Sequence, residues 1–228
     1  MKPIKVPSIV SLLGGLAIGC YSIPLMLHGG FGISTVSSLP YAVSCITDVF
    51  TFGQLNYIFQ AFILIFLLAV TRKFKMAYIP SFIISVTYGV GLDFGAAIVE
   101  SYPTDLIWYR ILWFALGAFL LCLGVYFMVR SSLPIVMDDM MVVALAEHYG
   151  VTFRRVKTLF DGSCIVMSLI VSLTFSHDMG GIGIGTILLA LFTGQTIHMI
   201  GVVLDPIFDI RPIKDLKKGV DNRCSTRL

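Results

Sequence analysis

The stretch PSIVSLLGGLAIGCYSIPLMLH, residues 7–28, is mainly apolar, carries no Asp, Glu, Lys or Arg, and is long enough to cross a lipid bilayer. Part of it recurs further along the chain, because Leu13-Gly14-Gly15 reappears 103 positions later as Leu116-Gly117-Ala118. Other pairs at the same spacing are Phe50 and Phe153, Ile79 and Ile182, and Gly91 and Gly194. The chain therefore reads as two copies of one unit.

The composition predicts a membrane protein. Of the 228 residues, 57% are hydrophobic and 13% are charged, whereas soluble domains carry about 25% charged residues. So few charged side chains cannot cover a water-facing surface. A spanning helix needs about 20 mainly apolar residues, and six segments meet that requirement: 7–28, 52–71, 77–99, 106–129, 159–176 and 180–203.

Each copy contains three such segments. Because three is odd, the second copy must cross the membrane in the direction opposite to the first. Inverted repeats of this kind commonly build transporters, with the substrate site where the halves meet. Pro103, among acidic and small residues, marks the boundary. We expect a first three-helix repeat over 1–103, a second over 104–205 and a cytoplasmic tail over 206–228.

Basic residues alternate between connections. Lys and Arg precede the first segment, follow the sixth, and lie in the connections after the second and the fourth, whereas 29–51, 100–105 and 177–179 contain none. Cytoplasmic loops carry an excess of Lys and Arg. The pattern predicts six spans, both termini in the cytoplasm, and a plasma (inner) membrane location.

Two connections, 29–44 and 131–146, are too apolar for ordinary loops and correspond under the repeat. Each begins with small or helix-breaking residues and continues as an apolar stretch of about three turns, which is too short to span. One interpretation is a re-entrant segment lining an internal cavity, because irregular backbone at membrane depth needs protein or water to satisfy it. The alternative is an amphipathic helix on the membrane surface.

The two short segments carry the first group of candidate substrate-binding residues. In this prediction the serine and threonine hydroxyls donate hydrogen bonds to a solute, and an inward carboxylate holds a cationic group or a coupling proton. Adjacent carboxylates cannot share one face of a helix. The candidates are Ser34, Thr35, Ser37, Ser38 and Tyr41 in the first segment and Asp138 and Asp139 in the second.

Asp93 is the clearest charge inside a predicted span, where a carboxylate costs about 2.5–3.5 kcal/mol on insertion scales. Its counterpart in the second copy is Thr196, beside Gln195 and His198. Under the functional interpretation these four residues form a polar path, with His198 able to relay a proton. Under the structural interpretation, the Asp93 side chain extends to the outer membrane interface, and His198 only donates a hydrogen bond to a neighbouring helix.

Asp161 lies four residues after Lys157, which predicts an ion pair along one helix face. The five cysteines have neither CxxC nor metal spacing and read as packing residues. We find no nucleophilic triad and no catalytic metal cluster. No enzymatic activity, no cofactor and no metal site are therefore predicted.

Several of these stretches resemble bacterial YczE/YyaS/YitT-like membrane proteins. The resemblance rests on 31–42, on Phe153-Arg154-Arg155-Val156-Lys157 with Asp161, and on Gly185-Thr186-Ile187 with Gly194, and it covers about residues 10–203. It implies a multi-pass inner-membrane protein of mostly unassigned activity, and it carries over Asp139 as an acidic turn, with Lys157, Asp161 and Thr186. Met137-Asp138 stands where that family often has Pro-Gly.

The sequence thus predicts an all-α membrane protein of two inverted three-helix repeats, each with a re-entrant segment. The favoured function is secondary transport of a small polar solute, cationic or zwitterionic, by alternating access. Proton or ion coupling and a homo-oligomer are left open, the lipid bilayer is a partner, and no nucleic acid is expected. The rival is a non-transporting scaffold or regulatory partner of an enzyme system. A channel would need a more continuous polar pore.

Overall fold

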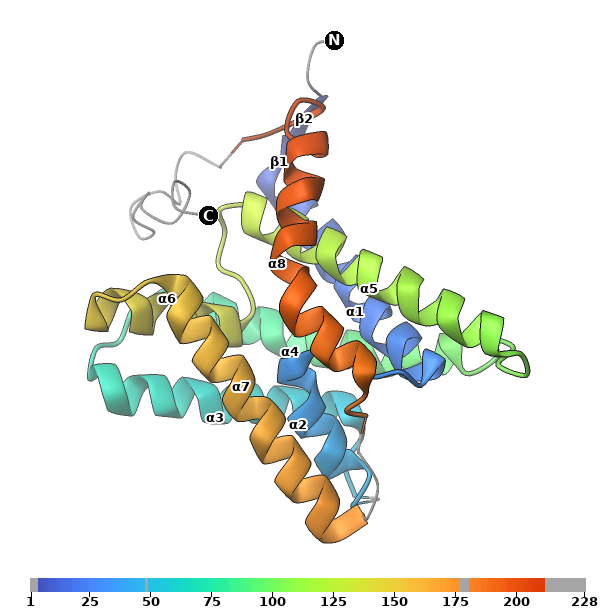
Figure 1. Ribbon diagram of the computed structural model, residues 1–228. Coiled ribbons are helices and arrows are strands. Elements are labelled where there is room, and N and C mark those ends of the chain that lie inside the picture. The colour runs from blue at the N-terminus through green and yellow to red at the C-terminus, as the bar shows by residue number, and fades with distance from the viewer. Residues whose placement is uncertain (1–3, 48, 177–180, 212–228) are drawn as a thin grey trace.

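The computed structural model describes residues 4–47, 49–176 and 181–211, and it is built almost entirely of α-helices (Figure 1). Six of them are long and apolar enough to cross a membrane, as the sequence predicts. The elements are β1 (Ile4–Pro7), α1 (Ser8–Gly29), α2 (Thr35–Ser44), α3 (Phe52–Thr71), α4 (Tyr78–Val99), α5 (Ile107–Arg130), α6 (Met137–Tyr149), α7 (Phe153–Val171), the π-helical turn η1 (Ser172–Ser176), α8 (Ile184–Leu204) and β2 (Phe208–Arg211).

Most boundaries fall within a few residues of those expected from hydropathy. The fifth long helix is the exception, because α7 begins at Phe153 and not at 159. Its first turns contain two arginines and Lys157. These residues lower the hydropathy, so the predicted span starts after them, but they do not prevent a helix from forming. Residues 177–180, part of the expected connection after this helix, lie outside the described residues.

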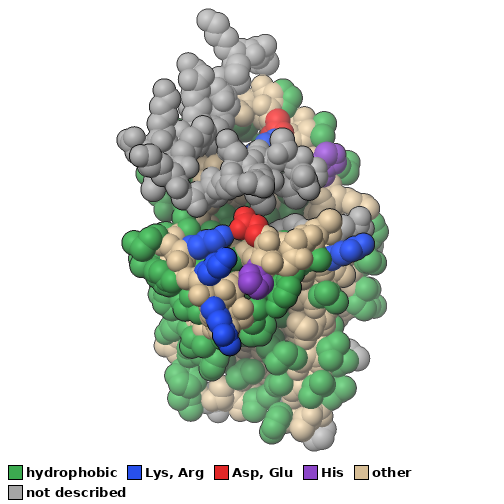
Figure 2. Space-filling model, turned by 90° about the vertical axis from the view of Figure 1, so that its left-hand side faces the viewer, with side chains coloured by type: hydrophobic (Ala, Val, Ile, Leu, Met, Phe, Trp, Pro, Cys, Tyr) green, Lys and Arg blue, Asp and Glu red, His purple; other side chains and the backbone are tan. Residues whose placement is uncertain are grey.

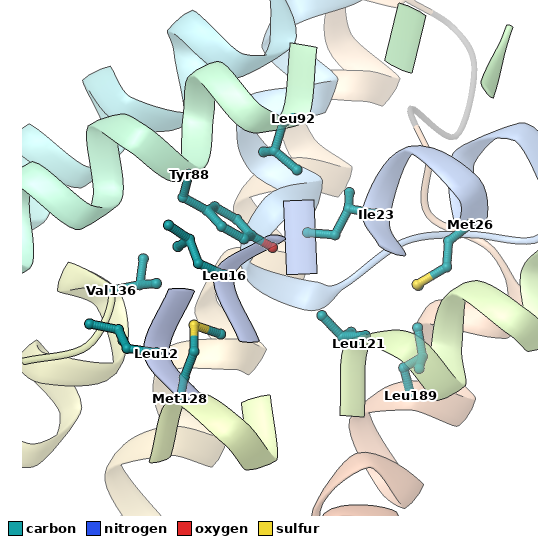
Figure 3. Close-up of a cluster of buried hydrophobic side chains, with 10 residues drawn as sticks. All are labelled: Leu12, Leu16, Ile23, Met26, Tyr88, Leu92, Leu121, Met128, Val136 and Leu189. Carbon is teal, nitrogen blue, oxygen red and sulfur yellow. The ribbon is translucent and has the colours of Figure 1, made fainter. Parts of the chain in front are cut away.

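α1 and α5 run antiparallel and pack closely along their whole length. Glycines on both helices let the backbones approach, as is usual between helices in membranes. The Ser11 hydroxyl donates a hydrogen bond to the Phe127 carbonyl across this seam at 2.8 Å. Figure 3 shows the apolar core built on the pair, to which Tyr88 and Leu92 of α4, Val136 just before α6 and Leu189 of α8 contribute.

The short helices pack on spanning helices from the other end of the sequence. α2 lies along α7, and α6 lies along α3. α4 packs on α1 and on α3, and α8 packs on α5. The two sequence halves are interleaved, and the contacts of α2 and α6 place both short helices between spanning helices.

The connections that carry basic residues are tied together by polar contacts. β1 pairs in parallel with β2, which brings the two ends of the described chain side by side. Arg130, at the end of α5, forms an ion pair with Asp205 just after α8. Lys75, between α3 and α4, pairs with Glu147 near the end of α6 at 2.8 Å. Figure 2 shows Lys and Arg side chains in a band across the described surface, with hydrophobic side chains predominating below it.

Candidate functional site

The N-terminus of α6 is held by side chains from two other helices. Free N–H groups at a helix start need acceptors. The N-cap residue here is Val136, whose apolar side chain cannot accept a hydrogen bond. The Met137 amide instead donates to the Ser85 hydroxyl of α4 at 2.8 Å. The Asp138 amide donates to Gln60 Oε1 of α3 at 2.9 Å. Asp138 and Asp139 therefore lie in the first turn of α6 and not at its cap.

Gln60 also donates from Nε2 to the Asp138 carboxylate at 3.3 Å. Asp138 is 9% exposed and Gln60 is 2% exposed. Gln60 precedes the end of α3 at Thr71 by eleven residues, which corresponds to about 16 Å along the helix axis. This carboxylate is thus well inside the bundle, with a neutral amide as its direct side-chain partner.

Burial, and to a lesser extent the neighbouring Asp139 carboxylate, raise the pKa of the Asp138 carboxyl. Lys157 and the Gln60 hydrogen bond act in the opposite direction, and the resulting pKa is about 6. Asp138 belongs to the short helix α6, outside the six long helices. A carboxyl with this pKa can exchange a proton near neutral pH.

Asp139 points to a different partner. Its Oδ1 lies 3.0 Å from the ammonium of Lys157, and that ammonium is 3.4 Å from Asp161 Oδ1. The predicted i,i+4 pair of α7 is therefore confirmed, and a third charged group joins it. Thr35 of α2 also lies beside the Asp161 carboxylate. Three carboxylates and one ammonium thus meet where α2, α3, α6 and α7 converge. We call this group of residues the charged cluster; it consists of Thr35, Gln60, Asp138, Asp139, Lys157 and Asp161.

α2 buries three of its hydroxyl residues, and the Ser38 hydroxyl donates to the Thr35 carbonyl of the same helix at 2.7 Å. Thr35, Ser37 and Ser38 are buried, and the Ser38 carbonyl accepts a hydrogen bond from Ser168 of α7 at 2.9 Å. Ser34 is the N-cap residue and is partly exposed. Tyr41, one turn further along α2, places its ring edge-on to Phe52 with the centroids 5.6 Å apart.

The start of α2 is held by Thr186 of α8, much as α6 is held by Ser85. The Ile33 amide donates to the fully buried Thr186 hydroxyl at 3.1 Å. Gly32 has a φ of +131°, and a β-carbon there would lie 2.4 Å from that hydroxyl oxygen. Only glycine fits this turn, because it combines an unusual backbone angle with a close contact.

One face of α7 is polar and buried, and the other is apolar and exposed. Cys164, Ser168 and Ser172 are buried and follow Lys157 and Asp161 at spacings of three or four residues, which places all five on one face. Val166, Met167 and Ile170 on the opposite side are exposed. A spanning helix with this pattern turns its polar side toward protein and its apolar side toward lipid.

The remaining predicted residues lie outside the charged cluster. Asp93 accepts hydrogen bonds from the Thr51 hydroxyl at 2.5 Å and the Gly53 amide at 2.7 Å, so it holds the start of α3. On α8, Gln195 and His198 are exposed, and the Thr196 hydroxyl donates to the Phe192 carbonyl of its own helix at 3.0 Å. The structure does not bring these four side chains together.

Sequence reasoning missed Gln60, Ser85, Ser168 and the buried Asn56. A detectable signal existed for two of them, because Asn56 and Gln60 are separated by four residues in an otherwise apolar segment, which puts both amides on one helix face. The two serines gave no such signal, since single serines are common in spanning helices.

Two of the cavities on the described part of the chain are apolar. One, of about 230 Å³, lies between α5 and α8 beside Phe114 and Leu189; the other, of about 270 Å³, lies between α2 and η1 beside Val43 and Phe175. Neither is lined by a residue of the charged cluster.

Comparison with known protein families finds a match over most of the chain. The model of a family of unknown function, DUF6198, matches residues 6–201. This match does not support the YczE/YyaS/YitT resemblance specifically. No curated protein and no solved structure matches the chain.

Proposed function

The chain belongs to the DUF6198 family of unknown function, and from this premise we propose that it is a secondary transporter of a small polar solute. Transport would proceed by alternating access, with the charged cluster as the solute site. The single observation that carries the proposal is a group of three carboxylates and one ammonium enclosed by four helices of a membrane protein. Ionisable groups inside a membrane bundle mark solute or proton pathways far more often than structural sites.

The helix arrangement supports this proposal. Our inferred inverted repeats, 1–103 and 104–205, are consistent with the antiparallel packing of α1 and α5 and with the exchanged contacts of α2 with α7 and α6 with α3. In transporters with inverted repeats, the site lies at the repeat interface and is formed by interrupted helices. The charged cluster draws Thr35 from the first half and Asp139, Lys157 and Asp161 from the second.

We further infer that α2 and α6 are re-entrant. Asp138 at the start of α6 contacts Gln60 deep in α3, whereas Glu147 near its end contacts Lys75 in the connection between α3 and α4. A helix with one end at depth and the other beside a basic connection enters the membrane without crossing it. The contacts of Thr35 with Asp161 and of Ser38 with Ser168 suggest the same for α2.

The proposed orientation puts both termini and the basic connections in the cytoplasm of a bacterial inner membrane. The pairing of β1 with β2 and the Lys75–Glu147 contact support a common side for these segments. Solute would then reach the charged cluster from the cytoplasm beside α6 and from outside beside α2.

The experiment is flux in reconstituted vesicles. Vesicles containing either wild-type protein or Asp139→Asn are given primary amines, amino acids or monovalent metal ions, and the uptake of each solute is measured. A pH indicator trapped inside the vesicles reports any accompanying movement of protons. We expect wild-type flux of at least one solute and loss of that flux in Asp139→Asn at equal incorporation. Gln195→Leu, on the exposed face of α8, is the matched control and should keep flux. Equal flux in wild type and Asp139→Asn would remove the charged cluster from the mechanism.

A non-transporting scaffold is the second candidate. The observation that favours it is that both cavities are apolar and away from the charged cluster, as expected when a membrane surface serves packing against another protein or lipid. The same vesicle experiment separates the two functions. A scaffold gives no protein-dependent flux for any member of the panel.

A further inference from the structure

We propose that the connection between α3 and α4, residues 72–77, binds the phosphate of an anionic phospholipid headgroup. Arg72 and Lys73 contact the phosphate in this proposal, while Phe74 and Met76 enter the acyl layer beside it. The inference rests on two cations without an ion-pair partner among the described residues, placed next to two exposed apolar side chains where two spanning helices end. It does not depend on whether the protein transports a solute.

The connection lies at a membrane surface. It follows Thr71, the last residue of α3, and precedes Tyr78, the first residue of α4, and both helices are long and apolar enough to cross a bilayer. It contains three basic residues and no acidic one. A short segment that joins two spanning helices is held by them at the edge of the hydrocarbon layer. Its basic side chains therefore lie at the depth of the lipid phosphates.

Two of the three cations are not neutralised by the protein. Arg72 and Lys73 are exposed, and neither takes part in an ion pair within the described part of the chain. The Lys75 ammonium, in contrast, lies 2.8 Å from the Glu147 carboxylate of α6. The charge left over at this surface is thus that of Arg72 and Lys73. A phosphate suits this pair, because arginine binds it through two N–H groups and lysine binds it as a point charge.

The backbone of Arg72 indicates that its side chain has a role. Arg72 is the residue at which α3 ends, and it has the left-handed conformation, with a φ of 49° and a ψ of 23°. Its amide donates to the Leu68 carbonyl at 2.9 Å. Glycine is the usual residue at such a helix end, because a β-carbon is unfavourable there. Strained conformations cluster at functional positions, so we attribute the presence of arginine to its guanidinium and not to the turn.

Phe74 and Met76 identify a lipid as the source of the phosphate. They are 59% and 76% exposed, although they lie among basic residues. The Phe74 ring is held edge-on against Tyr78 of α4, with the centroids 6.2 Å apart. A soluble phosphate compound has no group that would cover such side chains, whereas a phospholipid carries its acyl chains next to its phosphate. Surface segments that combine cations with large apolar residues bind anionic membranes through both parts.

The connection between α6 and α7 extends the same surface. The ion pair of Lys75 with Glu147 places the end of α6 next to the connection between α3 and α4. Tyr149, at the end of α6, and Arg155, in the first turn of α7, are both exposed. Figure 2 shows the same combination over a wider area, as a band of Lys and Arg above a hydrophobic surface. A headgroup bound at Arg72 would therefore lie within a surface that suits lipid on all sides.

The test uses the purified full chain in a nonionic detergent, with dioctanoylphosphatidylglycerol as the anionic probe. The melting temperature is followed against probe concentration at constant ionic strength. Dioctanoylphosphatidylcholine is the matched lipid without net charge, and glycerol phosphate is the matched soluble phosphate. We expect saturable stabilisation by the anionic lipid alone. Equal stabilisation by phosphatidylcholine would refute recognition of the headgroup charge, and equal stabilisation by glycerol phosphate would replace the lipid site by a site for free phosphate.

Arg72→Gly is the decisive variant, because it removes the side chain and relieves the turn. Without lipid, its melting temperature should equal or exceed that of wild type. Its midpoint for the anionic lipid should rise about tenfold, as expected for the loss of a charge-assisted hydrogen bond. A wild-type midpoint in this variant would overturn the inference. If Arg72→Gly does not fold, Lys73→Gln leaves the turn unchanged and serves the same comparison, and an unchanged midpoint counts equally against the site.

The double variant Lys75→Gln/Glu147→Gln is the matched control. It removes an ion pair from the same surface without changing the net charge, so it should keep the wild-type midpoint. An increase in midpoint as large as that of Arg72→Gly would mean that any polar change at this surface weakens the lipid response. That outcome would contradict a site built on Arg72 and Lys73.

Discussion

Gly15 and Gly124 face each other so closely that a β-carbon on either residue would clash with the carbonyl oxygen of the other. A β-carbon built at Gly15 would be 2.6 Å from the Gly124 carbonyl oxygen, and one built at Gly124 would be 2.8 Å from the Gly15 carbonyl oxygen. The two residues belong to α1 and α5, which correspond to each other under the sequence repeat. At this point α1 and α5 therefore meet backbone to backbone.

This contact predicts a strong effect from a single methyl group. Gly124→Ala should separate α1 from α5 and lower stability by about 1–3 kcal/mol, the usual cost of overpacking a well-packed interface. Gly14→Ala is the matched control, because a β-carbon at Gly14 has nothing within 4 Å. The measurement is the melting temperature of each purified variant in the same detergent. Equal melting temperatures for the two variants would mean that the helices are not in tight contact.

The two hydrogen bonds between Gln60 and Asp138 predict that removing the Gln60 amide also lowers stability. Gln60→Leu keeps the side-chain volume but leaves the Asp138 amide and carboxylate without these partners. A buried group left unsatisfied costs about 1–3 kcal/mol, so Gln60→Leu should melt well below wild type. Gln195→Leu makes the same chemical change on the exposed face of α8 and should melt close to wild type. A similar loss in both variants would point to a nonspecific effect of removing an amide.

Asp93 is expected to matter for stability and not for flux. It accepts hydrogen bonds from Gly53 and Thr51 at the start of α3. Loss of such a helix-start acceptor costs about 0.5–2 kcal/mol, so Asp93→Leu should lower the melting temperature while Asp93→Asn, which keeps an oxygen acceptor, loses less. Vesicle flux per folded protein should stay at the wild-type level in both. A variant that folds normally but loses flux would return Asp93 to the transport pathway.

The sequence identified the six long helices and the two short ones because their hydropathy and length are locally encoded. It also singled out Asp138, Asp139, Lys157 and Asp161, since charges in apolar surroundings are conspicuous. It could not show that Asp139 would meet Lys157, eighteen positions away on another helix, nor that Asp93 would turn to the start of α3. Those outcomes depend on how the helices pack. The spacing of Asn56 and Gln60 could have marked a polar face of α3, but it could not have shown that the partner of Gln60 lies 78 positions further along the chain.

The proposed topology predicts which connections can be labelled from outside. In a background lacking Cys45 and Cys224, a cysteine at Asp105, in the exposed connection between α4 and α5, should react with a membrane-impermeant maleimide in intact cells. A cysteine at Val151, in the exposed connection between α6 and α7, should react only after the membrane is opened. The reverse pattern would invert the orientation. Protection of both positions in intact cells would contradict the span count.

Asp138 predicts an unusual pH dependence of folding. Burial raises its folded-state pKa to about 6, from an ordinary value of 3.8. Because the folded-state pKa lies above the unfolded one, the protonated carboxyl favours folding. That stabilisation is complete when the pH is below the pKa of the unfolded chain, and it is lost as the pH rises through the pKa of the folded protein. The difference between the two pKa values corresponds to about 3 kcal/mol in the free energy of unfolding.

Asp138→Asn resembles the protonated side chain and keeps an oxygen for Gln60. Its melting temperature should therefore exceed that of wild type at neutral pH and change less from about pH 4 to about pH 8. Glu147→Gln is the matched control, because it neutralises an exposed carboxylate on the same helix, and its pH profile should follow wild type. The neighbouring Asp139, Lys157 and Asp161 stay in place in both variants, so a difference between the two profiles isolates Asp138. If Asp138→Asn keeps the wild-type profile, the buried carboxyl is not the group that titrates.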